Sequence, residues 1–352
     1  MTMPSTPTVH VLTILSGLGD AVSSRLPGTK VVNVRTTDMG FDGEVYKKMS
    51  RRLTDEELDL VADTEILLTH TFTFIQILKR KGPDFLTRLR WVHCMSVGVD
   101  NLVDFLGPEP PFVVTRSTED AAPALMAEHV VGQILCHERG WRPIYLKQLS
   151  KDCRGWGQFQ EYRGLAQLTV GVMGVGNMGR ATAGALKGFG CRVLGLARVP
   201  RGGAAAVPGV DRLWYGREGL PAFLQECDYV VNTLPSTPAT RGLLGGDVLS
   251  GAARRPVLVN VGRGDVISEA DLLRALGQGW LSAALLDCTE KEPPAEDSPL
   301  WTHPRVVMTP HTSTIANNDF KRESVAKDFC AKFAKFLAGQ PLAGQVDWQA
   351  GY

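Results

Sequence analysis

Residues 168–179 read LTVGVMGVGNMG, and this stretch decides the fold. Leu168–Met173 is short and apolar, which predicts a buried strand. The strand runs into a G-x-G-x-x-G loop formed by Gly174, Gly176 and Gly179, and residues 180–189 then have a helical pattern. The glycines permit a tight turn, close approach of a pyrophosphate and close helix–strand packing. We therefore expect a nucleotide site, with Asn177 and Met178 at the helix N-terminus that receives the phosphates.

The end of the next strand distinguishes between cofactors. NAD sites commonly place an acid about 20 residues after the loop, where it binds the ribose 2′-hydroxyl. Here the predicted strand over 192–196 ends in Ala197-Arg198, with Arg201 close behind and no carboxylate. Either arginine can hold a 2′-phosphate through paired N–H donors, or both are solvated loop residues. The missing acid favours NADPH over NADH.

Strand-like and helix-like segments alternate along most of the chain, which predicts an α/β protein with parallel sheets covered on both faces. Thr54 and Glu57 have the spacing of a capping box, so a helix should begin there. A long helical pattern covers 121–149, with Pro143 expected to kink or divide it, and another covers 317–337. The predicted strands are 9–15, 30–34, 65–69, 91–95, 113–115, 168–173, 192–196, 229–233, 257–260, 283–286 and 306–308.

Bulk composition excludes several classes of protein. The 352 residues exceed one ordinary core, and the formal charge of +1 provides no general attraction to nucleic acid or anionic lipid. The seven cysteines are odd in number and contain no C-x-x-C pair, so neither a disulfide framework nor a metal site is expected. No segment has the form of a secretory signal or a membrane span. We expect a cytoplasmic protein in a reducing compartment.

Three polar residues follow predicted strands in the last third of the chain: Arg263, Glu292 and His311. Because carboxyl ends of parallel strands meet at one sheet edge, these side chains should lie together beside the nucleotide loop. A fixed cation, an acid and an imidazole suffice to move a hydride onto a ketone. Each also has an ordinary interpretation: a surface ion pair for Arg263, a solvated acid for Glu292, and a hydrogen-bonded core histidine for His311.

Taken together, these motifs resemble the D-isomer-specific 2-hydroxyacid dehydrogenases, especially the glyoxylate/hydroxypyruvate reductase branch. The matching stretches are 174–179, 234–243, 259–266, 286–293, 298–301 and 309–311. The resemblance implies two Rossmann-like doubly wound domains with a cleft between them. The substrate domain would be discontinuous, residues 1–118 completed by 315–352, and 119–314 would form the NAD(P)-binding domain. It also implies a homodimer with a contact from the helical segment after Ala121.

The same resemblance implies roles for individual residues. His311 would donate the proton, oriented by Glu292, while Arg263 binds the small 2-keto acid substrate. The loop of Ser96, Val97 and Gly98 would receive the substrate carboxylate through backbone N–H groups. Further cofactor contacts are implied for Leu234, Pro235, Thr240, Val261, Gly262, Asp287 and His311, although Asp287 also suits a strand-terminal cap.

Two departures bear on the pocket. Cys288-Thr289 stands where the family usually has a valine and an aromatic residue, and Arg116 stands where many relatives have asparagine. Cys288 is either redox-sensitive or a buried packing residue. The expected activity is NADPH-dependent reduction of a 2-keto acid such as glyoxylate or hydroxypyruvate. A phosphite-type dehydrogenase and a nucleotide-sensing, corepressor-like interaction protein stay open as alternatives.

Overall fold

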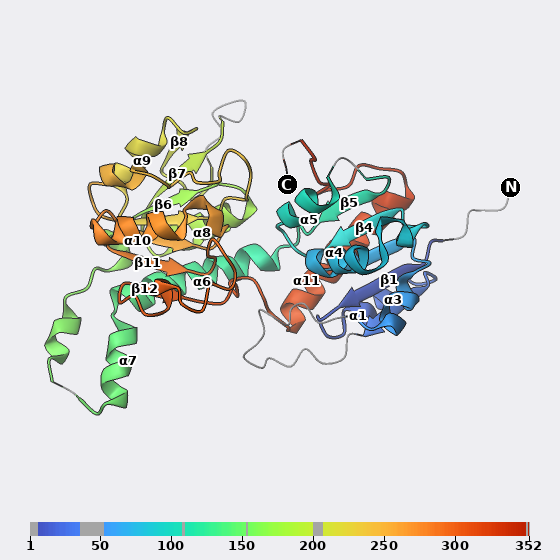
Figure 1. The fold of residues 1–352 in the computed structure, drawn as a ribbon, viewed down its shortest axis with the longest axis horizontal. Coiled ribbons are helices and arrows are strands. Elements are labelled where there is room, and N and C mark those ends of the chain that lie inside the picture. The colour runs from blue at the N-terminus through green and yellow to red at the C-terminus, as the bar shows by residue number, and fades with distance from the viewer. Residues whose placement is uncertain are drawn as a thin grey trace. The chain divides into compact units, whose positions relative to one another are not determined.

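The computed structural model describes residues 6–35, 53–107, 110–152, 154–199, 207–349 and 351. The chain divides into two compact units. Unit 1 comprises Met1–Ala121 and Ala316–Tyr352, and unit 2 comprises Ala122–Ile315. Each unit is built around one parallel sheet (Figure 1).

The sheet of unit 1 has the order β2-β1-β3-β4-β5, with every neighbouring pair parallel. Its strands are β1 (Val9–Thr13), β2 (Val31–Arg35), β3 (Ile66–Thr69), β4 (Trp91–Cys94) and β5 (Val113–Arg116). One face packs on α1 (Leu18–Arg25) and α11 (Asp319–Leu337). The other face packs on α3 (Asp55–Val61), α4 (Thr71–Lys81) and α5 (Asp100–Leu106). The C-terminal helix thus completes the core of the N-terminal sheet.

The sheet of unit 2 has the order β12-β11-β10-β9-β6-β7-β8, again parallel throughout. Its strands are β6 (Thr169–Met173), β7 (Arg192–Ala197), β8 (Arg212–Tyr215), β9 (Tyr229–Asn232), β10 (Val257–Asn260), β11 (Ala283–Leu286) and β12 (Val306–Met308). From β6 the chain adds β7 and β8 toward one edge of the sheet. It then returns to β9 on the other side of β6 and continues through β10 and β11 to β12 at the opposite edge. This is the doubly wound pattern of dinucleotide-binding sheets, and the direction of the chain across the sheet changes between β6 and β9. Ligands of such sheets bind at this switch point, beyond the carboxyl ends of the strands.

Helices cover both faces of this second sheet. On one side α6 (Ala121–Glu138) and α8 (Asn177–Gly188) pack on β6 and its neighbours, and on the other side lie α9 (Leu220–Glu226) and α10 (Glu269–Gly277). Short 3-10 turns are η1 (Pro83–Leu86), η2 (Trp156–Gln160), η3 (Leu165–Gln167), η4 (Val248–Gly251), η5 (Gly264–Val266) and η6 (Pro299–Trp301). The predicted α/β architecture with doubly covered parallel sheets is confirmed.

Local predictions differ in their outcome. The capping box is confirmed, since Glu57 N donates to Thr54 Oγ1 and Thr54 N donates to the Glu57 carboxylate. The prediction that Pro143 divides the long helix was wrong. The chain breaks at Gly140, which takes the left-handed conformation that glycine tolerates, and Pro143 lies in the first turn of α7 (Trp141–Leu149). Strand β8 was missed because its edge position leaves Arg212 and Tyr215 exposed.

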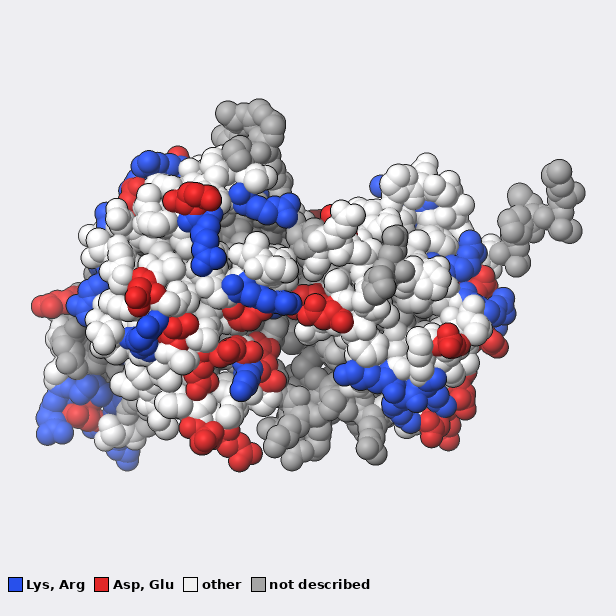
Figure 2. Space-filling view, turned by 45° about the horizontal axis from the view of Figure 1, so that its top comes forward, with Lys and Arg blue, Asp and Glu red and all other residues white. Residues whose placement is uncertain are grey.

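Charges of both signs lie on the face of the described residues that Figure 2 shows. Figure 2 shows basic and acidic side chains interspersed over the visible face of each unit, in keeping with the net charge of +1. Within the described residues, none of the helices is both long and apolar enough to cross a bilayer.

Candidate active site

The glycine loop has the geometry that a dinucleotide requires. Gly174 has a φ of 90°, which only glycine adopts readily. A Cβ on Gly179 would lie 1.8 Å from the carbonyl oxygen of Gly174, so the third glycine lets α8 pack against the turn. A Cβ on Gly176 would meet nothing within 4 Å, so the backbone is open at the start of α8. The loop therefore offers an accessible helix N-terminus to an anion.

The loops after β9, β10 and β11 interlock through two further glycines. A Cβ on Gly262 would lie 2.7 Å from the carbonyl oxygen of Leu234, and one on Gly264 would lie 1.9 Å from that of Thr289. These contacts hold the segment between them, which contains Arg263, against both neighbouring loops. The position of Arg263 along the sheet edge is therefore fixed by backbone packing.

Two buried asparagines at the ends of neighbouring strands hold the backbone of Arg263. Asn232 and Asn260 end β9 and β10, and their side chains are joined by a 2.8 Å hydrogen bond. Both also donate to the carbonyl oxygen of Arg263, over 3.3 Å and 3.1 Å. Sequence reasoning missed this pair. The available signal was a polar residue closing each of two otherwise apolar strands.

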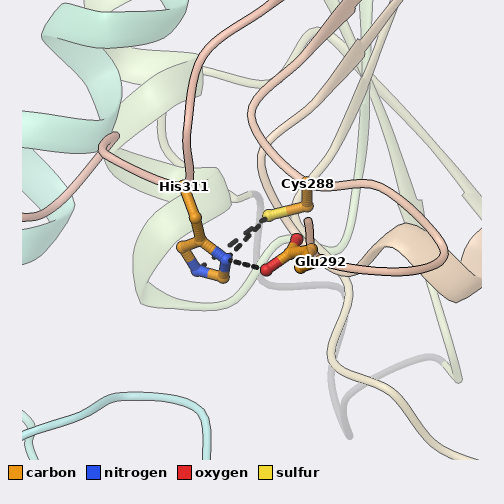
Figure 3. Close-up of side chains that lie close together, drawn as sticks. All are labelled: Cys288, Glu292 and His311. Atoms are coloured by element: carbon orange, nitrogen blue, oxygen red, sulfur yellow. Dashed lines mark hydrogen bonds and ion pairs between the residues drawn. The ribbon is translucent and has the colours of Figure 1, made fainter. Parts of the chain in front are cut away.

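His311 and Glu292 meet beyond the ends of β11 and β12. His311 Nδ1 lies 2.8 Å from Glu292 Oε2, and the other carboxylate oxygen accepts from Thr289 N at 3.2 Å (Figure 3). His311 has a φ of 49°, uncommon for a non-glycine residue. Its N–H is held by the carbonyl oxygens of Asp287 and Thr309, each at 3.0 Å. The turn thus aims the imidazole at the acid.

The electrostatics around His311 favour its protonated form. The hydrogen bond that His311 donates to the Glu292 carboxylate raises the pKa of His311 above its ordinary value, although burial and the positive charge of Arg263 both lower that pKa. Arg263 Nη1 donates to the Gly262 carbonyl oxygen at 2.9 Å, and the Cys288 thiol, which donates to the same oxygen at 3.4 Å, lies 3.7 Å from His311 Nδ1. The three residues predicted from sequence therefore gather at one edge of one sheet.

The carboxylate of Asp287 is directed at the turn that carries His311. It accepts hydrogen bonds from the Thr309 hydroxyl at 2.6 Å, Thr312 N at 2.8 Å and Ser313 N at 2.9 Å. Burial alone would raise the pKa of Asp287, but these donors lower it below its ordinary value. Asp287 therefore holds the 309–313 turn in place.

Comparisons with known proteins identify the family of the chain. The family described as D-isomer specific 2-hydroxyacid dehydrogenase, NAD binding domain, matches residues 131–313. A glyoxylate/hydroxypyruvate reductase A from Salmonella newport is 33% identical over 271 residues, which cover 75% of this chain and 82% of that protein. This chain belongs to the D-isomer specific 2-hydroxyacid dehydrogenases. It is accordingly an enzyme that binds a nicotinamide cofactor and interconverts a 2-keto acid and a 2-hydroxy acid.

Solved structures resemble this dehydrogenase over nearly its whole length. A family member from Xanthobacter autotrophicus Py2, in complex with NADPH and MES, has a TM-score of 0.77 and 30% identity and covers 99% of this chain and 100% of its own. The NADPH-dependent glyoxylate/hydroxypyruvate reductase of Sinorhizobium meliloti, in complex with NADP and sulfate, has a TM-score of 0.75 and 27% identity and covers 98% and 100%. The predicted family, reductase branch and fold are confirmed.

Cys288, which the sequence placed near the pocket as a redox-sensitive or a buried packing residue, lies against His311 in the structure. Its thiol is buried, and Sγ lies 3.7 Å from His311 Nδ1 and 4.0 Å from Nε2 (Figure 3). Burial raises the pKa of the Cys288 thiol well above its ordinary value, and Glu292 and Asp287 raise it further. Because Cys288 and His311 are 23 residues apart, only the pairing of β11 with β12 brings them together.

The remaining predicted residues lie on loops of one unit or the other. Ser96, Val97 and Gly98 follow β4 in unit 1 and are half-buried. Arg198 is exposed just after β7, whereas Arg201 lies outside the described residues. In unit 2 the loop after β9 is held by Thr240, whose hydroxyl donates to the carbonyl oxygen of Pro235 at 2.6 Å. Ligand contacts by these loops, and by Leu234, Val261, Gly262 and Asp287, stay predictions.

Proposed function

We propose that this dehydrogenase uses NADPH to reduce a small 2-keto acid of the glyoxylate or hydroxypyruvate type, forming the D-hydroxy acid where a stereocentre arises. The observation that carries the proposal is the 2.8 Å contact between His311 Nδ1 and Glu292 Oε2 beside Arg263, on the sheet edge that also carries the glycine loop. The substrate class is that of the reductases to which the chain is similar.

His311 is the proton donor in this proposal. A carboxylate accepts hydrogen bonds, so Nδ1 carries the proton of the contact with Glu292, and Nε2 is the nitrogen that faces the substrate in this proposal. In reduction, Nε2 gives its proton to the carbonyl oxygen as a hydride arrives at the carbon. The neutral imidazole then regains a proton from solvent. Glu292 acts as a positioning residue that also stabilises the imidazolium.

Arg263 binds the substrate in this proposal. Its backbone is held by the two asparagines and the flanking glycines, and Nη1 of its guanidinium donates to the Gly262 carbonyl oxygen at 2.9 Å. A guanidinium presents paired N–H donors that match a carboxylate or polarise a carbonyl. In this proposal the Arg263 guanidinium stabilises the negative charge that develops on the oxygen of the substrate carbonyl, and His311 supplies a proton to the same oxygen.

The residues of the glycine loop fit a nicotinamide dinucleotide. The open backbone at Gly176 leaves room for a pyrophosphate, and the N-terminal N–H groups of α8 are directed to the same point. When bound, the reduced nicotinamide supplies the hydride. NADPH is favoured over NADH because residues 197–201 contain no carboxylate and two arginines. The two neighbouring structures named above hold NADPH and NADP.

Steady-state kinetics test the activity. Purified protein is assayed with NADPH or NADH and a panel of glyoxylate, hydroxypyruvate and pyruvate, and separately with NADP⁺ or NAD⁺ and phosphite. We expect turnover with the first two acids and a higher kcat/KM for NADPH. Tight cofactor binding with negligible turnover would instead indicate a nucleotide sensor. Oxidation of phosphite with NADP⁺ would indicate a phosphite-type dehydrogenase.

Two sets of variants test the roles. His311→Ala should lower kcat by about 10²-fold or more while NADPH still binds, because proton donation contributes that much. Arg198→Ala combined with Arg201→Ala should weaken NADPH much more than NADH. Equal effects on both cofactors would contradict the assignment of the arginines.

We further propose that unit 2 is the cofactor domain, unit 1 the substrate domain, and that the enzyme is a homodimer. Four large apolar side chains of α7 are exposed: Trp141, Tyr145, Leu146 and Leu149. Figure 1 shows α7 projecting away from the sheet of unit 2. Such a patch on one helix is more typical of a protein contact than of a free surface. A second copy of the chain is the proposed occupant.

A further inference from the structure

His311 and two neighbouring side chains are of residue types that bind metal ions. Among the described residues, Cys288, Glu292 and His311 each offer one ligand atom, and these atoms all lie within 4.8 Å of one another. Figure 3 shows the thiol, the carboxylate and the imidazole directed toward a common point. The three come from the end of β11, the following loop and the turn after β12. No pattern of neighbouring cysteines or histidines in the sequence marks this group.

The spacing fits a tetrahedral metal ion. Bonds of about 2.0–2.3 Å to sulfur, nitrogen and oxygen place neighbouring ligand atoms about 3.3–3.6 Å apart. Sγ and Nδ1 are already 3.7 Å apart. Nδ1 and Oε2 are hydrogen-bonded at 2.8 Å and need to separate by about half an ångström to admit the ion. A rotation of the Glu292 side chain provides that movement, because Glu292 is on an exposed loop.

We propose that Cys288, Glu292 and His311 form an inhibitory binding site for Zn²⁺ or a similar borderline-soft divalent cation. A thiolate and an imidazole select zinc over magnesium or calcium. Three protein ligands leave a fourth position for water, as in open zinc sites. The ion's two charges are neutralised by the thiolate and the carboxylate. Thr289 N already holds the second oxygen of Glu292, which orients the carboxylate as an outer-shell contact does.

Binding at this site changes the protons as well as the geometry. The thiol proton of Cys288 and the Nδ1 proton of His311 pass to solvent, and metal–sulfur and metal–nitrogen bonds form in their place. With Nδ1 coordinated, the ring can no longer be the imidazolium that protonates a carbonyl oxygen. The cation also replaces the hydrogen bond between Glu292 and His311. Reduction is therefore blocked without any change at the cofactor loop.

The loss of activity rests on the proposed function, whereas the binding site does not, so binding is measured directly. Metal-free protein is titrated with Co²⁺, and the thiolate-to-cobalt charge-transfer absorption is recorded. Zn²⁺ is then added to displace the Co²⁺, and its affinity is obtained by competition. One ion per chain with a thiolate ligand is expected. Absence of this absorption in the wild type would overturn the proposal.

Substitutions of Cys288 test whether its thiolate is the sulfur ligand of the metal ion. Cys288→Val and Cys288→Ala should abolish the charge-transfer absorption and weaken Zn²⁺ by at least about tenfold. Valine has a similar volume, so the core should tolerate it. The matched control is Cys136→Ser, because Cys136 is an exposed cysteine on α6 of the same unit. Equal Zn²⁺ affinity in the wild type and in both Cys288 variants would also overturn the proposal.

Measurements of keto-acid reduction then distinguish failure of the proposed function from failure of the proposed metal site. If the keto-acid panel gives turnover, Zn²⁺ should inhibit the wild type, and Cys288→Val should need at least about tenfold more Zn²⁺ for the same inhibition. If the panel gives no turnover but Co²⁺ still reports a thiolate ligand that Cys288→Val removes, the proposed activity fails and the metal site stands. Turnover with Zn²⁺ inhibition unchanged by Cys288→Val would refute the metal site alone.

Discussion

At the scale of single residues, the titration of His311 depends on Glu292. The carboxylate is the largest cause that raises the pKa of the imidazole. In the proposed mechanism the protonated ring gives a proton to the substrate, so reductive kcat/KM should fall as pH rises through this pKa. Glu292→Gln removes the negative charge and should move that descending limb to lower pH. The measurement is the pH profile of kcat/KM for glyoxylate with saturating NADPH.

A neighbouring acid is the control for this experiment. Glu290 is exposed on the same loop, and its carboxylate accepts from Glu269 N, away from the imidazole. Glu290→Gln should therefore leave the limb where it is in the wild type. An unchanged limb in Glu292→Gln would show that another group sets the profile.

Some site residues were recognisable from sequence and others were not. Arg263, Glu292 and His311 follow strands at spacings that place them at one edge, so topology alone indicates that they gather. Cys288 looks like any apolar core position, and its contact with His311 arises from the register of β11 against β12. Asp287 was predicted either as a cofactor contact, which stays a prediction, or as a strand-terminal cap, and its carboxylate accepts from the N–H groups of the 309–313 turn.

At the scale of elements, the third glycine of the loop offers a test with an internal control. Gly179→Ala places a Cβ 1.8 Å from the Gly174 carbonyl oxygen, so α8 must move away from the turn. Overpacking of this kind costs about 1–3 kcal/mol, and the displaced helix N-terminus should also weaken NADPH binding. Calorimetry for NADPH and urea unfolding measure the two effects.

Gly184 provides the matched comparison on the same helix. It lies in the interior of α8, and an added Cβ would meet nothing within 4 Å. Gly184→Ala should stabilise the protein by about 0.5–1 kcal/mol, since alanine is the better helix former. NADPH binding should not change. Similar losses of stability and NADPH affinity in both variants would mean that any added methyl group disturbs α8. The contact between Gly179 and the glycine loop would then not be the cause.

A buried ion pair on α11 supports a second prediction at this scale. Lys332 is buried and Asp328 is largely buried, with Nζ 2.6 Å from Oδ2, and the Asp328 carboxylate also accepts from Thr118 N and Oγ1. Lys332→Met leaves a buried carboxylate without its cation. The free energy of unfolding should fall by about 3–5 kcal/mol.

The control for this pair is on the same helix. Lys335 is exposed, and Lys335→Met should change the free energy of unfolding by less than about 0.5 kcal/mol. Urea unfolding followed by fluorescence compares the two. If Lys332→Met is as stable as the wild type, the pair does not contribute net stability and a repacked methionine compensates for its loss.

The elements themselves were largely predictable because apolar strand runs are short and separated by turn residues. Buried parallel strands are hydrophobic on both faces, which makes them conspicuous. Edge strand β8 lacks this mark, since Arg212 and Tyr215 face solvent. The helix break was assigned to Pro143 because proline interrupts a helix in its interior. Gly140 ends the first helix earlier, and Pro143 is then tolerated in the first turn of the next helix.

At the scale of the whole molecule, the exposed apolar face of α7 is the feature that the monomer leaves unexplained. Trp141, Tyr145 and Leu149 recur at a spacing of four residues and so share one side of the helix. More than half of each side chain is exposed: 53%, 57% and 61%. Arg142 Nη1 donates to the Val306 carbonyl oxygen at 2.9 Å, which ties the helix to unit 2. The apolar side is thus held in a fixed orientation and available to a second copy.

Charge substitution tests this contact. Tyr145→Glu combined with Leu149→Glu places two like charges on the shared side, and a symmetric interface would double them across the contact. We expect wild-type protein at twice the chain mass in sedimentation equilibrium and the variant at the chain mass. Leu60→Glu is the control, because Leu60 is an equally exposed leucine on α3 in unit 1. A wild-type monomer, or a variant that still associates, would exclude α7 as the contact with a second copy.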